Sequence, residues 1–176
     1  MERIELARAD ITTERVDAIV NAANPYLTNG SGVAGAIRVA AGKAFQDECD
    51  RLVSELGPLA VGTDAVATDG YDLPCRYVIH VVGPVWGQQD EERSAGLLAA
   101  AHRAALEMAL ELEARSVSFP AISTGIFGYP VEKAAPVALE AVRDWLAGND
   151  AIELVRFCLF SEEDLGAWQA AARSLR

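Results

Sequence analysis

Residues 18–37 read Ala-Ile-Val-Asn-Ala-Ala-Asn-Pro-Tyr-Leu-Thr-Asn-Gly-Ser-Gly-Val-Ala-Gly-Ala-Ile, and this stretch decides the fold. It opens with a short β-branched run, Ala18 to Val20, which predicts a buried strand that stops at Asn21. Glycines follow at 30–35, and an Ala-rich helical pattern starts at Val33. A strand that leads through a glycine loop into a helix is typical of a parallel α/β sheet, which binds ligands at its strand ends.

The rest of the chain repeats this alternation of strand-like and helix-like segments. Further strands are expected at 4–9, 66–68, 77–82, 116–121 and 152–160. Helices are expected over 33–56 with a break near Gly42, over 91–113 and 131–146, and after an N-cap at Ser161. Strands separated by helical segments predict a mostly parallel sheet with helices on both faces.

A second glycine loop, Ser123-Thr124-Gly125-Ile126-Phe127-Gly128, follows the predicted strand 116–121 and precedes the helix that begins near Val131. Backbone amides at a helix N-terminus hold an anion without a basic side chain, and glycines allow close approach. Two such loops on one sheet therefore predict a site for two phosphates. The alternatives are a plain solvent loop for the first segment and, for the second, aromatic residues that only cap the core.

Composition limits the function. The chain has 176 residues, 51% of them apolar, and a formal charge of -11, which suits a single domain and disfavours binding to duplex nucleic acid. Its start has no leader-like apolar core, and no run is long enough for a membrane span, so we expect a cytoplasmic protein without membrane contact.

Cys49, Cys75 and Cys158 are too widely spaced for a zinc site or a disulfide framework, and we expect them to be buried thiols. No metal or cofactor is expected.

The segment Gly30-Ser31-Gly32-Val33-Ala34-Gly35 also matches Gly-x-Gly-x-x-Gly, so a nicotinamide-dependent oxidoreductase is an alternative. Two observations disfavour it. The strand ends near Asn21, about nine residues before the first glycine, whereas the dinucleotide fingerprint needs a tight turn. The acidic residues expected about 20 positions further on fall inside an amphipathic helix instead of at a strand end.

Polar residues at other strand ends have two interpretations each. Asp10 suits the exocyclic amine of a purine, since a carboxylate only accepts hydrogen bonds, but it can equally cap a turn through Thr12. Asn21 and Asn24 suit ribose hydroxyls, although Asn24 before a proline is also a common turn former. His80 lies in an apolar run and is interpreted as a core histidine outside the site.

Six blocks in order resemble the macro domain family across almost the whole chain. They are 10–12, 16–24, 30–37, 70–74, 78–84 and 119–128. The resemblance implies one macro domain over residues 1–176, with a three-layer α/β/α sandwich around a mixed, mostly parallel sheet. It also implies a cleft for ADP-ribose or for an ADP-ribosylated protein.

By this resemblance, Asp10 holds the adenine amine with Ile11 beside it, and Asn24 meets the distal ribose with Phe127 nearby. Two backbone segments surround the diphosphate. They consist of Gly30, Ser31, Gly32, Val33 and Ala34, and of Ser123, Thr124, Gly125, Ile126 and Phe127. Asn21 completes the predicted ligand-binding set.

Catalysis depends on Ala34. Macro domains that hydrolyse ADP-ribose esters often carry Asp at this position, and a methyl group cannot act as a general base. Some relatives with Val-Ala-Gly-Ala still hydrolyse, through positioning of water by the ligand's phosphate and through backbone donors. Asn24 is the candidate catalytic residue, and Ser31 lies beside the expected water path.

Three functions follow in order of preference. The first is an ADP-ribose-binding domain that hydrolyses ADP-ribose esters, from Asp or Glu side chains or from O-acetyl-ADP-ribose, at a modest rate. The second is a reader of ADP-ribose without catalysis. The third is the oxidoreductase.

Overall fold

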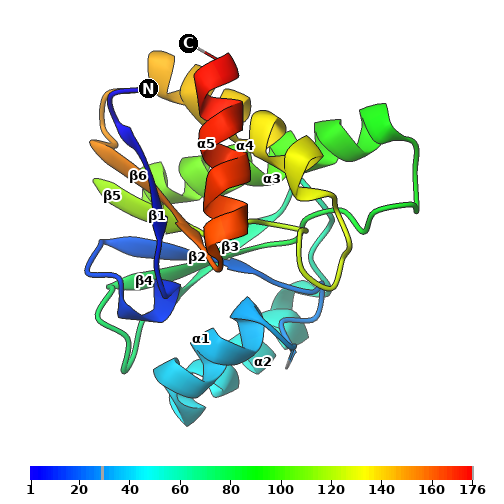
Figure 1. Ribbon diagram of the computed structural model, residues 1–176. Helices are drawn as coiled ribbons and strands as arrows, with labels where there is room; N and C mark the ends of the chain where they lie inside the picture. The colour runs from blue at the N-terminus through cyan, green and yellow to red at the C-terminus, as the bar shows by residue number, and fades with distance from the viewer. Residues whose placement is uncertain (29, 176) are drawn as a thin grey trace.

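A six-stranded sheet forms the centre of the computed structural model, which describes residues 1–28 and 30–175 (Figure 1). The strands are β1 (Ile4–Arg8), β2 (Ala18–Ala22), β3 (Ala65–Asp69), β4 (Tyr77–Val81), β5 (Ser116–Phe119) and β6 (Leu154–Leu159). They lie in the order β1-β6-β5-β2-β4-β3. β3 pairs antiparallel with β4, and the other neighbouring pairs of described strands are parallel. Five strands therefore end at the same edge of the sheet.

Helices cover both faces of this sheet (Figure 1). They are η1 (Ile11–Thr13), α1 (Val33–Ala41), α2 (Lys43–Leu56), α3 (Glu91–Glu111), α4 (Val131–Ala147) and α5 (Glu162–Ser174). Because strand residues alternate between faces, Ile19 packs in the core beneath α1 and α2, and Val20 packs in the core beneath α3, α4 and α5. The predicted three-layer sandwich with a mixed, mostly parallel sheet is confirmed.

Each of the six described strands differs from the sequence prediction by one or two residues at one or both ends, and two of these differences have a clear physical reason. β2 continues through Asn21 to Ala22, because these residues pair with His80 and Val81 on the neighbouring β4, and the Asn21 side chain also bonds to His80. β5 ends at Phe119, because Pro120 has no amide hydrogen for the ladder. The break between α1 and α2 at Gly42 and the Ser161 cap of α5 are confirmed.

The first and last strands of the chain are neighbours. β1 is an edge strand that pairs along its whole length with β6, from Ile4 opposite Val155 to Arg8 opposite Leu159. Just before β1, the Arg3 guanidinium donates to the carbonyls of Leu146, Asn149 and Ile152. The N-terminal segment is therefore fixed to the end of α4 as well as to the sheet.

The cysteines and histidines lie inside the fold. Cys49, Cys75 and Cys158 are buried free thiols, as predicted. His80 and His102 have no exposed surface. Among the described helices, none is long and apolar enough to cross a bilayer.

Candidate functional site

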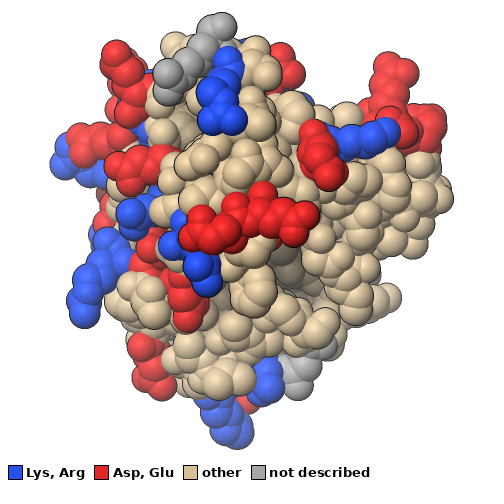
Figure 2. Space-filling view, viewed as in Figure 1, with Lys and Arg blue, Asp and Glu red and all other residues tan. Residues whose placement is uncertain are grey.

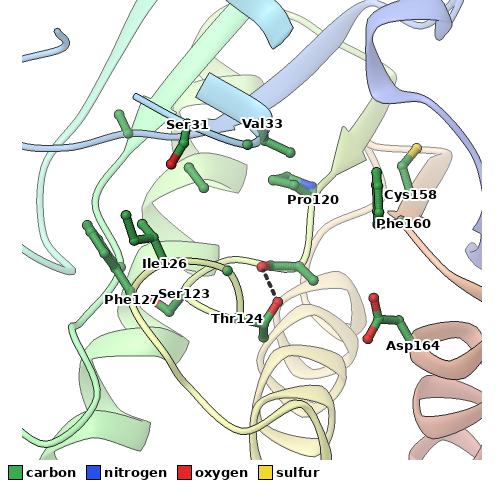
Figure 3. A pocket seen from close by; sticks show the side chains of 16 residues that line it. Ser31, Val33, Pro120, Ser123, Thr124, Ile126, Phe127, Cys158, Phe160 and Asp164 are labelled. Carbon is green, nitrogen blue, oxygen red and sulfur yellow. Dashed lines mark hydrogen bonds between the residues drawn. The ribbon is translucent and has the colours of Figure 1, made fainter. Parts of the chain in front are cut away.

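Two adjoining cavities form one cleft where the parallel strands end, and the space-filling view is hollowed there (Figures 2 and 3). Their volumes are about 420 Å³ and about 740 Å³, which is the usual size range of ligand pockets. Four residues line both cavities: Gly32, Val33, Cys158 and Phe160. We call the smaller one the loop cavity and the larger one the η1 cavity.

The first wall of the loop cavity is the start of α1. Gly32 is the N-cap with a φ of 68°, a left-handed conformation that favours glycine, and no side chain of residues 1–28 or 30–175 caps the helix. The first helical backbone bond there comes from the amide of Ala36 to the carbonyl of Gly32 at 3.0 Å. Within the described residues, the amides of Val33, Ala34 and Gly35 have no partner. This helix end can therefore accept an anion.

The second wall is the loop 123–128. Backbone bonds shape the loop, from Tyr129 to the Ser123 carbonyl at 2.9 Å and from Gly128 to the Gly125 carbonyl at 3.0 Å. They leave the amides of Gly125, Ile126 and Phe127 without an internal partner in the described part of the chain. The loop therefore offers a second set of donors beside the same cavity.

Ser123 contributes a hydroxyl to this cavity. Its backbone has a φ of 68°, which is strained for a serine. The side chain is 5% exposed, and its Oγ has no hydrogen-bond partner among the described atoms. A Cβ on Gly83 would overlap this hydroxyl, so the glycine after β4 leaves the room that Ser123 occupies. A buried donor that faces a cavity suits a ligand oxygen.

Asp10 and Ile11 lie in the η1 cavity. Asp10 Oδ1 accepts hydrogen bonds from the Thr12 amide at 3.0 Å and from the Thr12 hydroxyl at 2.7 Å, so the capping interpretation of Asp10 is observed. The residue also lines the cavity and is exposed, so a ligand amine can reach it. The two interpretations are compatible.

A buried acidic residue anchors η1 to the sheet. Glu14 is 7% exposed and accepts a bond from the Ser118 hydroxyl at 2.8 Å. It also pairs with Arg156 on β6 at 3.3 Å. Burial raises the pKa of the nearby Cys158 thiol to about 12, and the Glu14 carboxylate adds to this shift. Cys158 is therefore a neutral wall of the cleft at physiological pH and not a nucleophile.

The two predicted asparagines do not line either cavity. Asn21 is 5% exposed and donates from Nδ2 to His80 Nδ1, 3.1 Å away, while the other nitrogen of His80 lies 3.0 Å from the Thr68 hydroxyl. Asn24 Oδ1 accepts from the amides of Tyr26 and Thr28 at 3.0 and 3.3 Å. These side chains shape β2 and the start of the first loop.

Of the other predicted residues of the two loops, most line the loop cavity and two do not. Ser31, Gly32, Val33 and the segment 123–127 line the loop cavity, but Gly30 and Ala34 do not. A Cβ on Gly30 would lie 3.3 Å from the Ala34 methyl group, so these two residues pack against each other. A Cβ on Gly35 would lie only 2.5 Å from the Gly30 carbonyl, so Gly35 keeps the loop closed onto the helix.

The sequence analysis missed Phe160 and Asp164. Phe160 is 92% exposed and lines both cavities, and Asp164 lines the loop cavity from the first turn of α5. The rule that selected Asp10, namely that functional side chains follow parallel strands, applies equally to Phe160 directly after β6. Among the described residues, no cluster of His, Cys, Asp and Glu could hold a metal ion.

Comparisons with known proteins give a consistent result. The family model described as Macro domain matches residues 20–138. The Chlorobaculum tepidum macro domain-containing protein CT2219 is 49% identical, over 96% of this chain and 94% of its own. Mouse MACROD1, named an ADP-ribose glycohydrolase, is 45% identical over 96% of this chain, which spans about half (51%) of its length.

Two solved macrodomain structures are also similar to this chain. The Oceanobacillus iheyensis macrodomain with ADP has a TM-score of 0.93 and 41% identity, and the match covers 98% of this chain and 90% of that one. The Trypanosoma brucei macrodomain in complex with ADP-ribose has a TM-score of 0.86 and 34% identity, and the match covers 97% of this chain and 69% of that one.

Proposed function

Since this chain belongs to the macro domain family, we propose that its cleft binds ADP-ribose, free or attached to a protein. One observation carries the proposal: amides at the start of α1 and in the loop 123–128, which have no internal partner among the described residues, line one cavity. A protein with a net charge of -11 needs such neutral donors to bind a diphosphate. The relatives solved with ADP and ADP-ribose support the same ligand.

The ligand is proposed to span both cavities. Adenine lies by Asp10 and Ile11 in the η1 cavity, and the diphosphate lies between the two walls of the loop cavity. The proposed diphosphate contacts are Gly30, Ser31, Gly32, Val33 and Ala34 on one side and Ser123, Thr124, Gly125, Ile126 and Phe127 on the other. The distal ribose is proposed to lie at the start of the first loop, where Asn24 accepts hydrogen bonds from two backbone amides and Asn21 bonds to the His80 side chain.

We propose slow hydrolysis of ADP-ribose esters in this cleft. Ala34 supplies no general base, and the absence of a base costs typically 10²- to 10⁴-fold in rate. The remaining groups position the reaction: backbone amides and the Ser123 hydroxyl stabilise developing charge, and a ligand phosphate orients water. The ADP-ribose glycohydrolase named among the relatives supports this activity, whereas Ala34 favours the second candidate, a reader without catalysis.

Two measurements test these proposals. Calorimetry should give much tighter binding for ADP-ribose than for NAD, and the reverse order would support the oxidoreductase instead. Incubation with a protein ADP-ribosylated on Asp or Glu, and with O-acetyl-ADP-ribose, should release ADP-ribose faster than buffer alone. No release at saturating protein would leave the reader function.

We also propose that residues 1–176 form a single macro domain and that the protein works in the cytoplasm. The three buried free thiols suit a reducing compartment. Expression with a compartment-specific fluorescent tag would test the location, and limited proteolysis would test for one resistant unit.

Asp10→Asn should weaken ADP-ribose binding by about tenfold, near 1.4 kcal/mol, because the amide no longer offers an acceptor-only oxygen pair to the adenine amine. Asparagine keeps one oxygen for the Thr12 amide, so η1 should keep its cap. Calorimetry on this variant is compared with Glu2→Gln, which removes a charge outside both cavities. Equal affinities for all three proteins would contradict the adenine assignment.

Asn24→Ala should lower the rate of hydrolysis by about tenfold and the affinity by less than about threefold, because Asn24 holds the loop that aligns the distal ribose. Steady-state kinetics and calorimetry separate the two effects. Thr28→Val is the matched control, since it removes only the hydroxyl bond to Asn24. A larger loss in affinity than in rate would make Asn24 a binding residue.

A further inference from the structure

Asp164 lies in the first turn of α5, and its carboxylate is not used by the fold. Its backbone amide donates to the Ser161 hydroxyl at 3.1 Å, which caps the helix. In the described part of the chain, its side chain makes no hydrogen bond or ion pair, although it is half-buried. Figure 3 shows the carboxylate directed into the loop cavity, on the side of Thr124. The cavity also contains the buried, unpartnered hydroxyl of Ser123.

The position of Asp164 along the cleft assigns it to one part of the ligand. The proposed function places adenine in the η1 cavity and the diphosphate in the loop cavity, so the adenosine ribose lies where the cavities join. Cys158 and Phe160 line that junction. Glu162 flanks it in the η1 cavity and Asp164 flanks it in the loop cavity. Two carboxylates therefore flank the junction where the proposed ligand would place its adenosine ribose.

The described residues that line the cleft offer little positive charge to a further phosphate. Arg8 is the only basic residue among the described residues that line either cavity. Its Nη1 atom lies 3.3 Å from the Glu162 carboxylate, so its charge is already paired. The acidic start of α5 is visible at the cleft as a red patch in Figure 2. A dianion placed on the ribose would face Asp164 without compensation.

We propose that Asp164 is a specificity-determining residue that selects an adenosine ribose with free hydroxyls and rejects a ribose that carries a 2′-phosphate. An ionised carboxylate accepts hydrogen bonds from a diol, and it repels a phosphate at the same place. This inference rests on the proposed function. It assigns the cleft to ADP-ribose whose parent dinucleotide carries no 2′-phosphate.

The test measures the affinities of the full chain for ADP-ribose and for its 2′-phosphate by calorimetry at low salt. The wild type should bind the 2′-phosphate at least about tenfold more weakly. Asp164→Asn keeps the size and removes the charge, and it should reduce this ratio by about fivefold or more. Glu163→Gln is the matched control, because Glu163 lies in the same helical turn but lines neither cavity. Its ratio should equal that of the wild type.

The outcomes separate this inference from the function on which it rests. Equal affinities of the wild type for both ligands would overturn the role of Asp164 and leave ADP-ribose binding intact. A ratio that Asp164→Asn does not change would also overturn it, because the rejection would then be steric. No binding of ADP-ribose to the wild type would instead refute the proposed function. Added salt should lower the wild-type ratio and leave that of Asp164→Asn nearly constant.

Discussion

Gly125→Glu is expected to weaken ADP-ribose binding by about a hundredfold or more without unfolding the protein. A Cβ at Gly125 meets no described atom within 4 Å other than those of its chain neighbours, so the fold has room for the substitution. Gly125 lines the loop cavity, so the new side chain occupies the space proposed for the diphosphate. A carboxylate near two phosphates costs about 3 kcal/mol at close range near a protein surface, and each 1.4 kcal/mol is tenfold in affinity.

Two controls isolate the cause. Gly125→Gln has the same length without the charge, so it should lose less affinity than the glutamate variant when both are measured by calorimetry. Thermal unfolding should give similar midpoints for the three proteins. A folded glutamate variant that binds like the wild type would exclude the loop 123–128 from the site.

Lowering the pH from 7 to 5 is expected to destabilise the protein, although Asp and Glu of the unfolded chain stay mostly ionised in that range. Burial lowers the pKa of His80 to about 3 and the pKa of His102 to about 4. In the unfolded chain both imidazoles have a pKa near 6.5, so below that pH the unfolded state binds protons that the native state does not. The free energy of unfolding is therefore highest above pH 6.5 and falls as the pH drops toward the folded-state values.

The size of this effect is large for a small domain. Between pH 7 and pH 5 each histidine should cost about 2 kcal/mol, or about 4 kcal/mol together. Denaturant unfolding at pH 7, 6 and 5 measures it, in a range where Asp and Glu of the unfolded chain are still mostly ionised. His102→Phe should halve the loss of unfolding free energy between pH 7 and pH 5, because it removes one of the two buried imidazoles. An aromatic ring suits this position, since His102 stacks on Phe119 with ring centroids 5.3 Å apart and its Nε2 has no partner among the described atoms. An unchanged free energy of unfolding at pH 5 would contradict the neutral burial of both rings.

The fold was predictable because local patterns and tertiary packing agree. The strand 18–20, the helix break at Gly42 and the Ser161 cap each depend on a few neighbouring residues, and all were found where expected. Strand ends were less accurate, because they depend on partners. β2 continues through Asn21, which pairs with His80 on β4, and no local pattern of the chain contains that pairing.

The candidate site was predictable to a similar extent. Glycine loops after strands identify both walls of the loop cavity, since a glycine-rich strand-to-helix turn is a local feature. Asp164 and Phe160 follow the last strand, where the sequence resembles an ordinary capped helix start. Only the position of β6 beside β1 and β5 places them on the cleft. The role of Asn24 could not be decided from the sequence, because its amide group can bind a ribose hydroxyl or the backbone of the turn that contains it.

The pairing of β1 with β6 determines when β1 can join the sheet during synthesis. Asp10 and Ile11 follow β1 closely, yet among the described strands β1 pairs only with β6, which comes last in their chain order. A nascent chain must therefore carry β1 unpaired until β6 has emerged. The proposed nucleotide, which bridges the η1 and loop cavities, would bind only after β1 and β6 have paired, and by mass action it would stabilise that pairing.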